Sequence, residues 1–127
     1  MTIQETLARV DCASPNQYTR AQKMQWLSYL EGLLYDEIVR WHVDARGIAE
    51  MLPAWPYKEE TPDETVLLLP APHDVLYEKY LLAQVDLANA EIVRYNNSIT
   101  VFNGALAAFA AAYNRNNPPA QPARVQL

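Results

Sequence analysis

Hydrophobic residues recur at helical spacing in the N-terminal third of the chain and predict two helices. Thr2 and Glu5 have the spacing of a capping box for the first, short helix, which residues 14–16 (Ser-Pro-Asn) end. Its apolar face comprises Ile3, Leu7 and Val10. Thr19 repeats the capping spacing with the glutamine three residues later, and we expect the second helix over residues 20–42. The apolar positions of this second helix are Met24, Leu27, Leu30, Leu34, Ile38 and Trp41.

One hydrophobic stripe with steps of four and three residues runs through the last third of the chain. Its positions are Leu81, Val85, Ala88, Ile92, Tyr95, Ile99, Phe102, Leu106, Phe109 and Tyr113. Because the phase is kept through Asn96 and Asn97, we favour one continuous helix over residues 74–114, which would be ~60 Å long. The alternative is a break at Asn96-Asn97, with Ser98 capping a fourth helix. Two shorter helices cannot cover so long a stripe, so we expect part of it to pack on a neighbouring subunit.

Prolines separate these helical blocks. Five of the nine prolines lie in residues 44–72, a long acidic loop with two basic and six acidic residues. Within it, residues 66–69 (Val-Leu-Leu-Leu) are compatible with one short strand. Residues 116–127 hold three prolines and predict an extended C-terminal arm. We therefore predict an all-α fold: a small helical bundle in one domain, residues 1–115, with a long C-terminal helix and an extended tail.

Charge and cysteine content exclude several classes of protein. A net charge of −5 without a basic cluster argues against a protein that grips nucleic acid through its phosphates. The single cysteine, Cys12, excludes an internal disulfide and a cysteine-rich zinc site, and we place it in or near the core. The N-terminus lacks the features of a signal peptide, and no apolar run is long enough to span a bilayer. We expect a soluble protein that is made in the cytosol.

Side chains that could carry catalysis are few and poorly spaced. His42 follows Asp36 and Glu37 by six and five residues, whereas a metal pair on one helix face needs three or four. His73 lies at a predicted helix start, where a cation is disfavoured. The chain contains no glycine-rich phosphate loop and no hydrolase motif. We therefore predict no catalytic residue, no cofactor and no metal, and a protein that is not an enzyme.

Acidic residues near the middle of the long stripe predict an ion pair on the helix surface and no catalytic site. Asp86 and Glu91 are five residues apart and face different ways on a helix, so they do not form a carboxylate pair. Glu91 and Arg94 have the spacing of an ion pair on a helix surface.

Aromatic residues and one glycine indicate contacts. Gly32, inside the second helix, costs roughly 1 kcal/mol relative to alanine, which we interpret as close packing against another backbone. Trp26 lies off the main stripe and fits either a wider core face or an interface anchor. Trp55 and Tyr57 indicate that the acidic loop docks at least partly against another surface, without showing which. The candidate partner-binding residues are Trp26, Trp55, Tyr57, Pro118, Pro119, Arg124, Val125 and Leu127.

Two stretches of the chain resemble a known family. The first comprises residues 16–19 (NQYT), 26–32 (WLSYLEG) and 35–38 (YDEI). The second comprises residues 68–72 (LLPAP), 77–80 (YEKY), 86–89 (DLAN), 94–98 (RYNNS), 102–103 (FN) and 113–115 (YNR). Together they resemble the head–tail connector (adaptor, head-completion) proteins of siphophages and prophages of Gram-positive bacteria. The motifs are structural, and they cover most of residues 16–115.

The resemblance implies a helical subunit of an oligomeric ring, a dodecamer, in the neck of the virion between capsid and tail. Such a ring binds the portal protein, extends the DNA channel and presents a surface to the next head-completion or tail protein. DNA passes through the channel without specific binding, and no membrane is involved. An acidic subunit fits such a channel because like charges repel the DNA backbone. We expect the tail, from Pro118 onwards, to dock on the portal.

Other functions fit the same pattern. One is a stopper or tail-completion protein, which would occupy another level of the neck. Another is a helical regulator outside the virion that binds a protein of the phage or its host. Mass spectrometry of purified particles separates the last possibility from the others.

Overall fold

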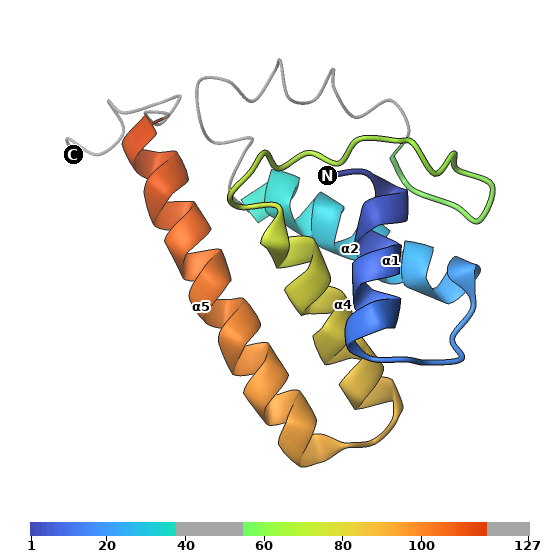
Figure 1. The fold of residues 1–127 in the computed structure, drawn as a ribbon. Coiled ribbons are helices and arrows are strands. Elements are labelled where there is room, and N and C mark those ends of the chain that lie inside the picture. The colour runs from blue at the N-terminus through green and yellow to red at the C-terminus, as the bar shows by residue number, and fades with distance from the viewer. Residues whose placement is uncertain (38–54, 117–127) are drawn as a thin grey trace.

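The computed structural model describes residues 1–37 and 55–116 (Figure 1). Helices are the only regular elements in these two ranges, which confirms the predicted all-α class. The helices are α1 (Ile3–Ala13), α2 (Arg20–Glu37), α4 (Val75–Ala88) and α5 (Ile92–Asn116). Helix α5 is the long C-terminal helix that the sequence predicts. The predicted end of the second helix, His42 and the C-terminal arm all lie outside the described residues.

Both predicted capping threonines begin a helix. The N–H of Glu5 donates to the Thr2 hydroxyl at 3.2 Å, and the N–H of Gln22 donates to the Thr19 hydroxyl at 3.1 Å. These bonds satisfy N–H groups that have no partner within the helix. The predicted apolar face of α1 is also confirmed, since Ile3 is fully buried and packs with the rest of the core.

Helix α4 is the central element, against which α1, α2 and α5 pack (Figure 1). Its core positions include Leu76, Leu81 and Val85, each at most 1% exposed. Helix α2 contributes the stripe that periodicity predicts, and all four of these side chains are buried: Met24, Leu27, Leu30 and Leu34. The core therefore lies along the middle of α4, and α5 covers the side that α1 and α2 leave open (Figure 1).

The single helix predicted over residues 74–114 is wrong, because the chain reverses between α4 and α5. At the reversal the N–H of Ala90 donates to the Leu87 carbonyl, and the N–H of Glu91 donates to the Asp86 carbonyl, both at 3.0 Å. This pair of bonds is the Schellman pattern that ends many helices. Ala90 takes the left-handed position of that pattern, with φ 60°.

The alternative break at Asn96-Asn97 is wrong as well, since both residues lie within α5. Ser98 caps no helix. Its hydroxyl donates to the Asp86 carboxylate of α4 at 2.6 Å, across the hairpin.

Antiparallel packing of α4 and α5 gives the physical reason for the reversal. Tyr80 lies against Phe102 with ring centroids 5.2 Å apart, and His73 lies against Phe109 at 5.3 Å. The two contacts are seven residues apart in both partners, with His73 just before the start of α4, and they define the register of the hairpin. The stripe of α5 thereby packs on α4 of the same chain, which a continuous helix would not allow.

The segment of residues 55–74, which we call the docking segment, lies along the helices as the aromatic residues predict. Arg20 anchors it: the guanidinium donates to the carbonyls of Glu59 (2.9 Å) and Thr61 (2.6 Å) and pairs with Asp63 at 2.5 Å. The buried side chains of the segment are Tyr57, Leu67 and Leu69.

The short strand predicted at residues 66–69 is wrong, because the docking segment makes only one isolated antiparallel bridge, Thr2 with Val66. Leu67 and Leu69 are instead buried in the helical core, and Leu68 is partly buried against it. Continuous apolar character therefore marks burial here rather than a sheet.

Replacing Ala90 by glycine tests the reversal. An alanine with positive φ is strained, so A90G should raise the free energy of unfolding by about 1 kcal/mol. In a continuous helix the same change would lower it by about 1 kcal/mol. Urea unfolding of the two proteins measures the sign, and a decrease would contradict the hairpin.

Candidate functional site

A fully buried carboxylate, Glu31 of α2, joins three parts of the fold. Its Oε2 accepts hydrogen bonds from the Tyr57 hydroxyl (2.7 Å) and the Leu68 N–H (3.0 Å). Its Oε1 accepts one from the Tyr77 hydroxyl of α4 (2.6 Å). The Tyr77 oxygen in turn accepts the N–H of Leu69 at 2.8 Å. One carboxylate therefore connects α2, the docking segment and α4 in a network whose members support one another.

Burial controls the protonation of this network. It raises the pKa of Glu31 above the usual 4.5, while the hydrogen bonds from Tyr77, Leu68 and Tyr57 act in the opposite direction. Burial, and then the neighbouring Glu31 charge, raise the pKa values of both tyrosines. Glu31 is 0% exposed and both of its oxygens accept bonds from the protein. Its geometry therefore suits a structural link and not contact with a substrate.

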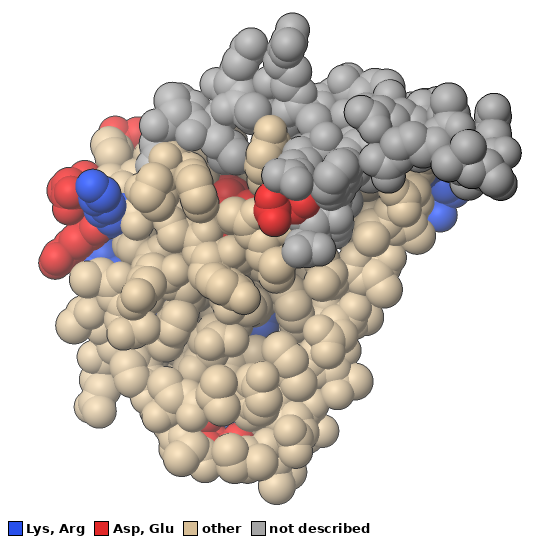
Figure 2. Space-filling view, turned by 180° about the vertical axis from the view of Figure 1, so that it is seen from behind, with Lys and Arg blue, Asp and Glu red and all other residues tan. Residues whose placement is uncertain are grey.

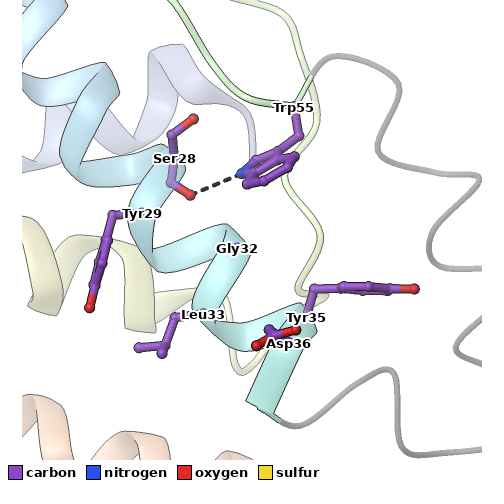
Figure 3. Close-up of a pocket in the computed structure, with 7 residues that line it drawn as sticks. All are labelled: Ser28, Tyr29, Gly32, Leu33, Tyr35, Asp36 and Trp55. Atoms are coloured by element: carbon purple, nitrogen blue, oxygen red, sulfur yellow. Dashed lines mark hydrogen bonds between the residues drawn. The ribbon is translucent and has the colours of Figure 1, made fainter.

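A cavity of about 410 Å³ follows the second half of α2 beside Trp55 (Figure 3). We call it the Trp55 groove; it is lined by Ser28, Tyr29, Gly32, Leu33, Tyr35, Asp36 and Trp55. The indole N–H of Trp55 donates to the Ser28 carbonyl at 2.9 Å. This bond holds the ring over Gly32, where an added Cβ would lie 2.9 Å from the Trp55 Cζ2. The close packing predicted at Gly32 is therefore with a side chain and not with a backbone.

Trp26 lies on another side of α2, half-buried. Its ring packs edge-on against Tyr18, with centroids 5.6 Å apart. It borders two smaller hollows of about 260 and 340 Å³, which reach Leu87 and Tyr80 of α4 respectively. Trp26 thus widens the contact between α2 and α4, and part of its ring stays accessible.

Charged side chains meet at the α4–α5 reversal. Asp86, 4% exposed, has its Oδ1 3.7 Å from the Arg94 Nε. Arg94 also pairs with Glu91 at 3.0 Å, which confirms the predicted ion pair. Asp86 and Glu91, which helical spacing does not bring together, both contact Arg94 because the chain reverses between them. This cluster secures the turn.

Helix α5 exposes apolar side chains and carries few charges. Three large apolar side chains on it are more than half exposed: Ile92 (55%), Val93 (76%) and Val101 (53%). The helix contains no acidic residue and only two basic ones, Arg94 and Arg115. In Figure 2 the α5 side of the molecule, on the right, shows no acidic side chain along its length. A helix face in solvent ordinarily carries charges, so this surface is unusual.

The predicted partner-binding residues fall into three groups: exposed, buried and outside the described residues. Trp55 is 44% exposed and lines the groove, and Trp26 is partly accessible. Tyr57 is 4% exposed and its hydroxyl is bound to Glu31, so it belongs to the core. The predicted tail residues lie outside the described residues: Pro118, Pro119, Arg124, Val125 and Leu127.

The sequence prediction missed Glu31. Its signal is a charged residue between Leu30 and Leu34 on the apolar stripe of α2, a position where charge requires buried partners.

The remaining chemical candidates are dispersed. Cys12 is exposed, which corrects its predicted place in the core. It lies two residues after the buried Val10 and therefore points to the opposite side of α1. Among residues 1–37 and 55–116, His, Cys, Asp and Glu form no cluster of three that could hold a metal ion. In the same ranges no helix has the length and apolar character needed to cross a membrane.

Comparison with known proteins adds no assignment, since no family model, curated protein or solved structure matches the chain.

Glu31 should make stability depend on pH. The pKa of Glu31 in the folded protein lies above its unfolded value near 4.5. At pH values between the two, the folded state therefore binds more protons than the unfolded state. The free energy of unfolding should therefore rise, relative to E31Q, as the pH falls from neutral towards 4.5. Thermal unfolding of both proteins across this range measures the difference. The matched control E64Q removes an exposed carboxylate and should follow the wild type; parallel curves for wild type and E31Q would contradict the assignment.

Replacing Gly32 by alanine should disturb Trp55. The added Cβ would lie 2.9 Å from the indole, so G32A should shift the indole N–H resonance of Trp55. The clash should also cancel the stabilisation that alanine normally gives over glycine in a helix. In a W55A background the same change should stabilise the protein by about 1 kcal/mol. G104A is the matched control, because a Cβ there meets nothing within 4 Å, and it should stabilise in both backgrounds. Equal effects of G32A with and without Trp55 would refute the contact.

Proposed function

We propose that this chain is a structural virion protein: a head–tail connector (adaptor) subunit that forms a ring between the portal and the next neck or tail protein. The proposal starts from the resemblance of residues 16–115 to connector proteins. The exposed apolar side chains of α5, a helix without acidic residues, are the observation that supports it best. A ring subunit needs such a surface for its neighbouring copies.

The composition of α5 favours contact with another protein. Val93 and Val101 would lose unfavourable contact with water if a neighbour covered them. Gly104 lies on the same helix, and among the described residues nothing within 4 Å requires a glycine there. Glycine lowers helix stability by roughly 1 kcal/mol, and its absent side chain lets another backbone approach closely.

Charge favours α5 over the other helices as the surface between copies. With a net charge of −5, copies of this chain repel one another at long range. Acidic residues occur in α1, α2 and α4 but not in α5. A contact that uses α5 therefore brings the least like charge together. In a ring, α5 of one subunit would meet a different surface of the next, which is the heterologous arrangement that closes by rotation.

The docking segment supplies the acidic surface that the proposal assigns to the DNA channel or to the next ring. Glu59, Glu60, Asp63 and Glu64 are exposed along it, with Lys58 as the one cation among residues 55–72. A surface of this charge repels the DNA backbone and lets it pass without adhesion.

Purified particles of the phage or induced prophage that encodes the chain test the proposal. Mass spectrometry should detect the chain in particles, and a cryo-EM map of the neck should trace it as a ring directly below the portal. Density at a lower level would identify a stopper or tail-completion protein instead. Absence from the particles would favour a regulator and would refute the virion role.

A substitution on α5 tests the ring contact itself. V101E places a carboxylate in the proposed interface, where an unpaired buried charge is costly, and should reduce ring assembly on portals about 10-fold or more. V66E is the matched control, because Val66 is 66% exposed but lies on the docking segment. Native mass spectrometry of portal complexes measures the assembly, and circular dichroism confirms that both variants fold. Equal assembly of V101E and wild type would refute the α5 contact.

A further inference from the structure

We propose that the Trp55 groove binds the proline-rich segment of this chain's own tail, residues 119–124 (Pro-Ala-Gln-Pro-Ala-Arg). The groove and the segment have complementary chemistry, and each is otherwise unexplained. This inference does not rest on the proposed function, since it needs no virion partner. It also gives the tail a receptor on the chain itself, besides the portal on which the sequence places it.

Aromatic rings form the walls of the groove. Tyr29 is 63% exposed and Trp55 44% exposed, although both are large apolar surfaces. Figure 3 shows Trp55, from the docking segment, on the side of α2 that carries Tyr35, and Tyr29 on the side that carries Leu33. The hydrogen bond from Trp55 to Ser28 holds the indole in place before any ligand arrives. Rigid, preformed aromatic walls are the feature that binds proline rings.

The spacing of the prolines fits the length of this groove. In a polyproline II helix three residues make one turn of about 9 Å, so Pro119 and Pro122 would lie on one face that distance apart. The rows of α2 from Ser28 to Tyr35 extend about 10 Å along the helix axis. Two successive prolines can therefore contact Trp55 and the tyrosines together.

Charge selects the direction of the segment. Arg124 is the one charged residue among residues 117–127, and Asp36 is the one carboxylate that lines the groove within the described residues. A carboxylate accepts up to about four hydrogen bonds, so Asp36 can pair with a guanidinium whatever else it contacts. Asp36 lies at the C-terminal end of the groove, which places Arg124 at that end. An arginine beside tyrosine rings gains a cation–π contact as well.

The chain also brings the segment to the correct side of the molecule. Figure 1 shows the C-terminal ends of α2 and α5 in the upper half of the view, and the tail follows α5 directly. The groove lies along the C-terminal half of α2. The tail therefore begins at the end of the molecule where α2 also ends.

A labelled peptide tests the contact. The probe is a fluorescein-labelled peptide of residues 117–127, titrated into the full-length chain that carries P119A, P122A and R124A, so that its own tail does not compete. We expect saturable anisotropy and a shift of the Trp55 indole N–H resonance in NMR spectra. A peptide with the same three substitutions should bind with an affinity at least about 10-fold lower.

Variants of the groove locate the binding site. Y29A in the same receptor should weaken binding about 10-fold, because it removes one aromatic wall. D36N and the R124A peptide should each weaken binding, and together they should cost little more than either alone, since they remove one ion pair. The matched control V93A, on α5, should bind like the parent receptor.

Three results would overturn the proposal: no saturable binding, equal binding of the triply substituted peptide, or binding that Y29A and D36N leave unchanged.

Discussion

The buried carboxylate of Glu31 is the group on which the arrangement of this chain depends. A segment rich in proline has few backbone bonds of its own, so side chains must hold it in one place. Glu31 accepts the N–H of Leu68 directly, and Tyr77 accepts that of Leu69. A buried charge is tolerated only when donors surround it, and tyrosines from two elements provide them. The network thereby fixes the docking segment against α2, and with it the position of Trp55 over Gly32.

The helices and their buried faces could be predicted from periodicity, because burial of one side leaves a 3.6-residue pattern in the sequence. The reversal between α4 and α5 could not, since only three residues separate the helices and the step of four from Ala88 to Ile92 preserves the phase of the stripe. Ala88 and Ile92 fit that stripe, yet both are exposed. Ala90 adopts a positive φ where a glycine would have marked the turn. Alanine is the strongest helix former, so propensity also favoured the continuous helix.

The candidate site could be predicted only in part, because its partners are distant in sequence. Tyr57 and Tyr77 lie 26 and 46 residues from Glu31, and no local pattern pairs them. Gly32 did indicate a close approach, but the approaching group is an indole that only the tertiary fold brings there. The aromatic residues of the docking segment correctly predicted docking. Their different roles, Tyr57 in the core and Trp55 at the surface, follow from the hydroxyl that Glu31 binds and the indole that Ser28 binds.

Two surfaces of different chemistry result from this arrangement. On α5, apolar side chains remain exposed without acidic neighbours on the same helix, so a copy of the chain can approach this face with little like-charge repulsion. The Trp55 groove combines aromatic rings with the carboxylate of Asp36, so it suits a cationic, proline-rich segment better than a neutral helix. Because the groove lies on α2 and the apolar face on α5, one subunit can use both at the same time. Contact through a helix face in one direction and through an extended segment in the other is heterologous, and heterologous contacts are the kind that build rings.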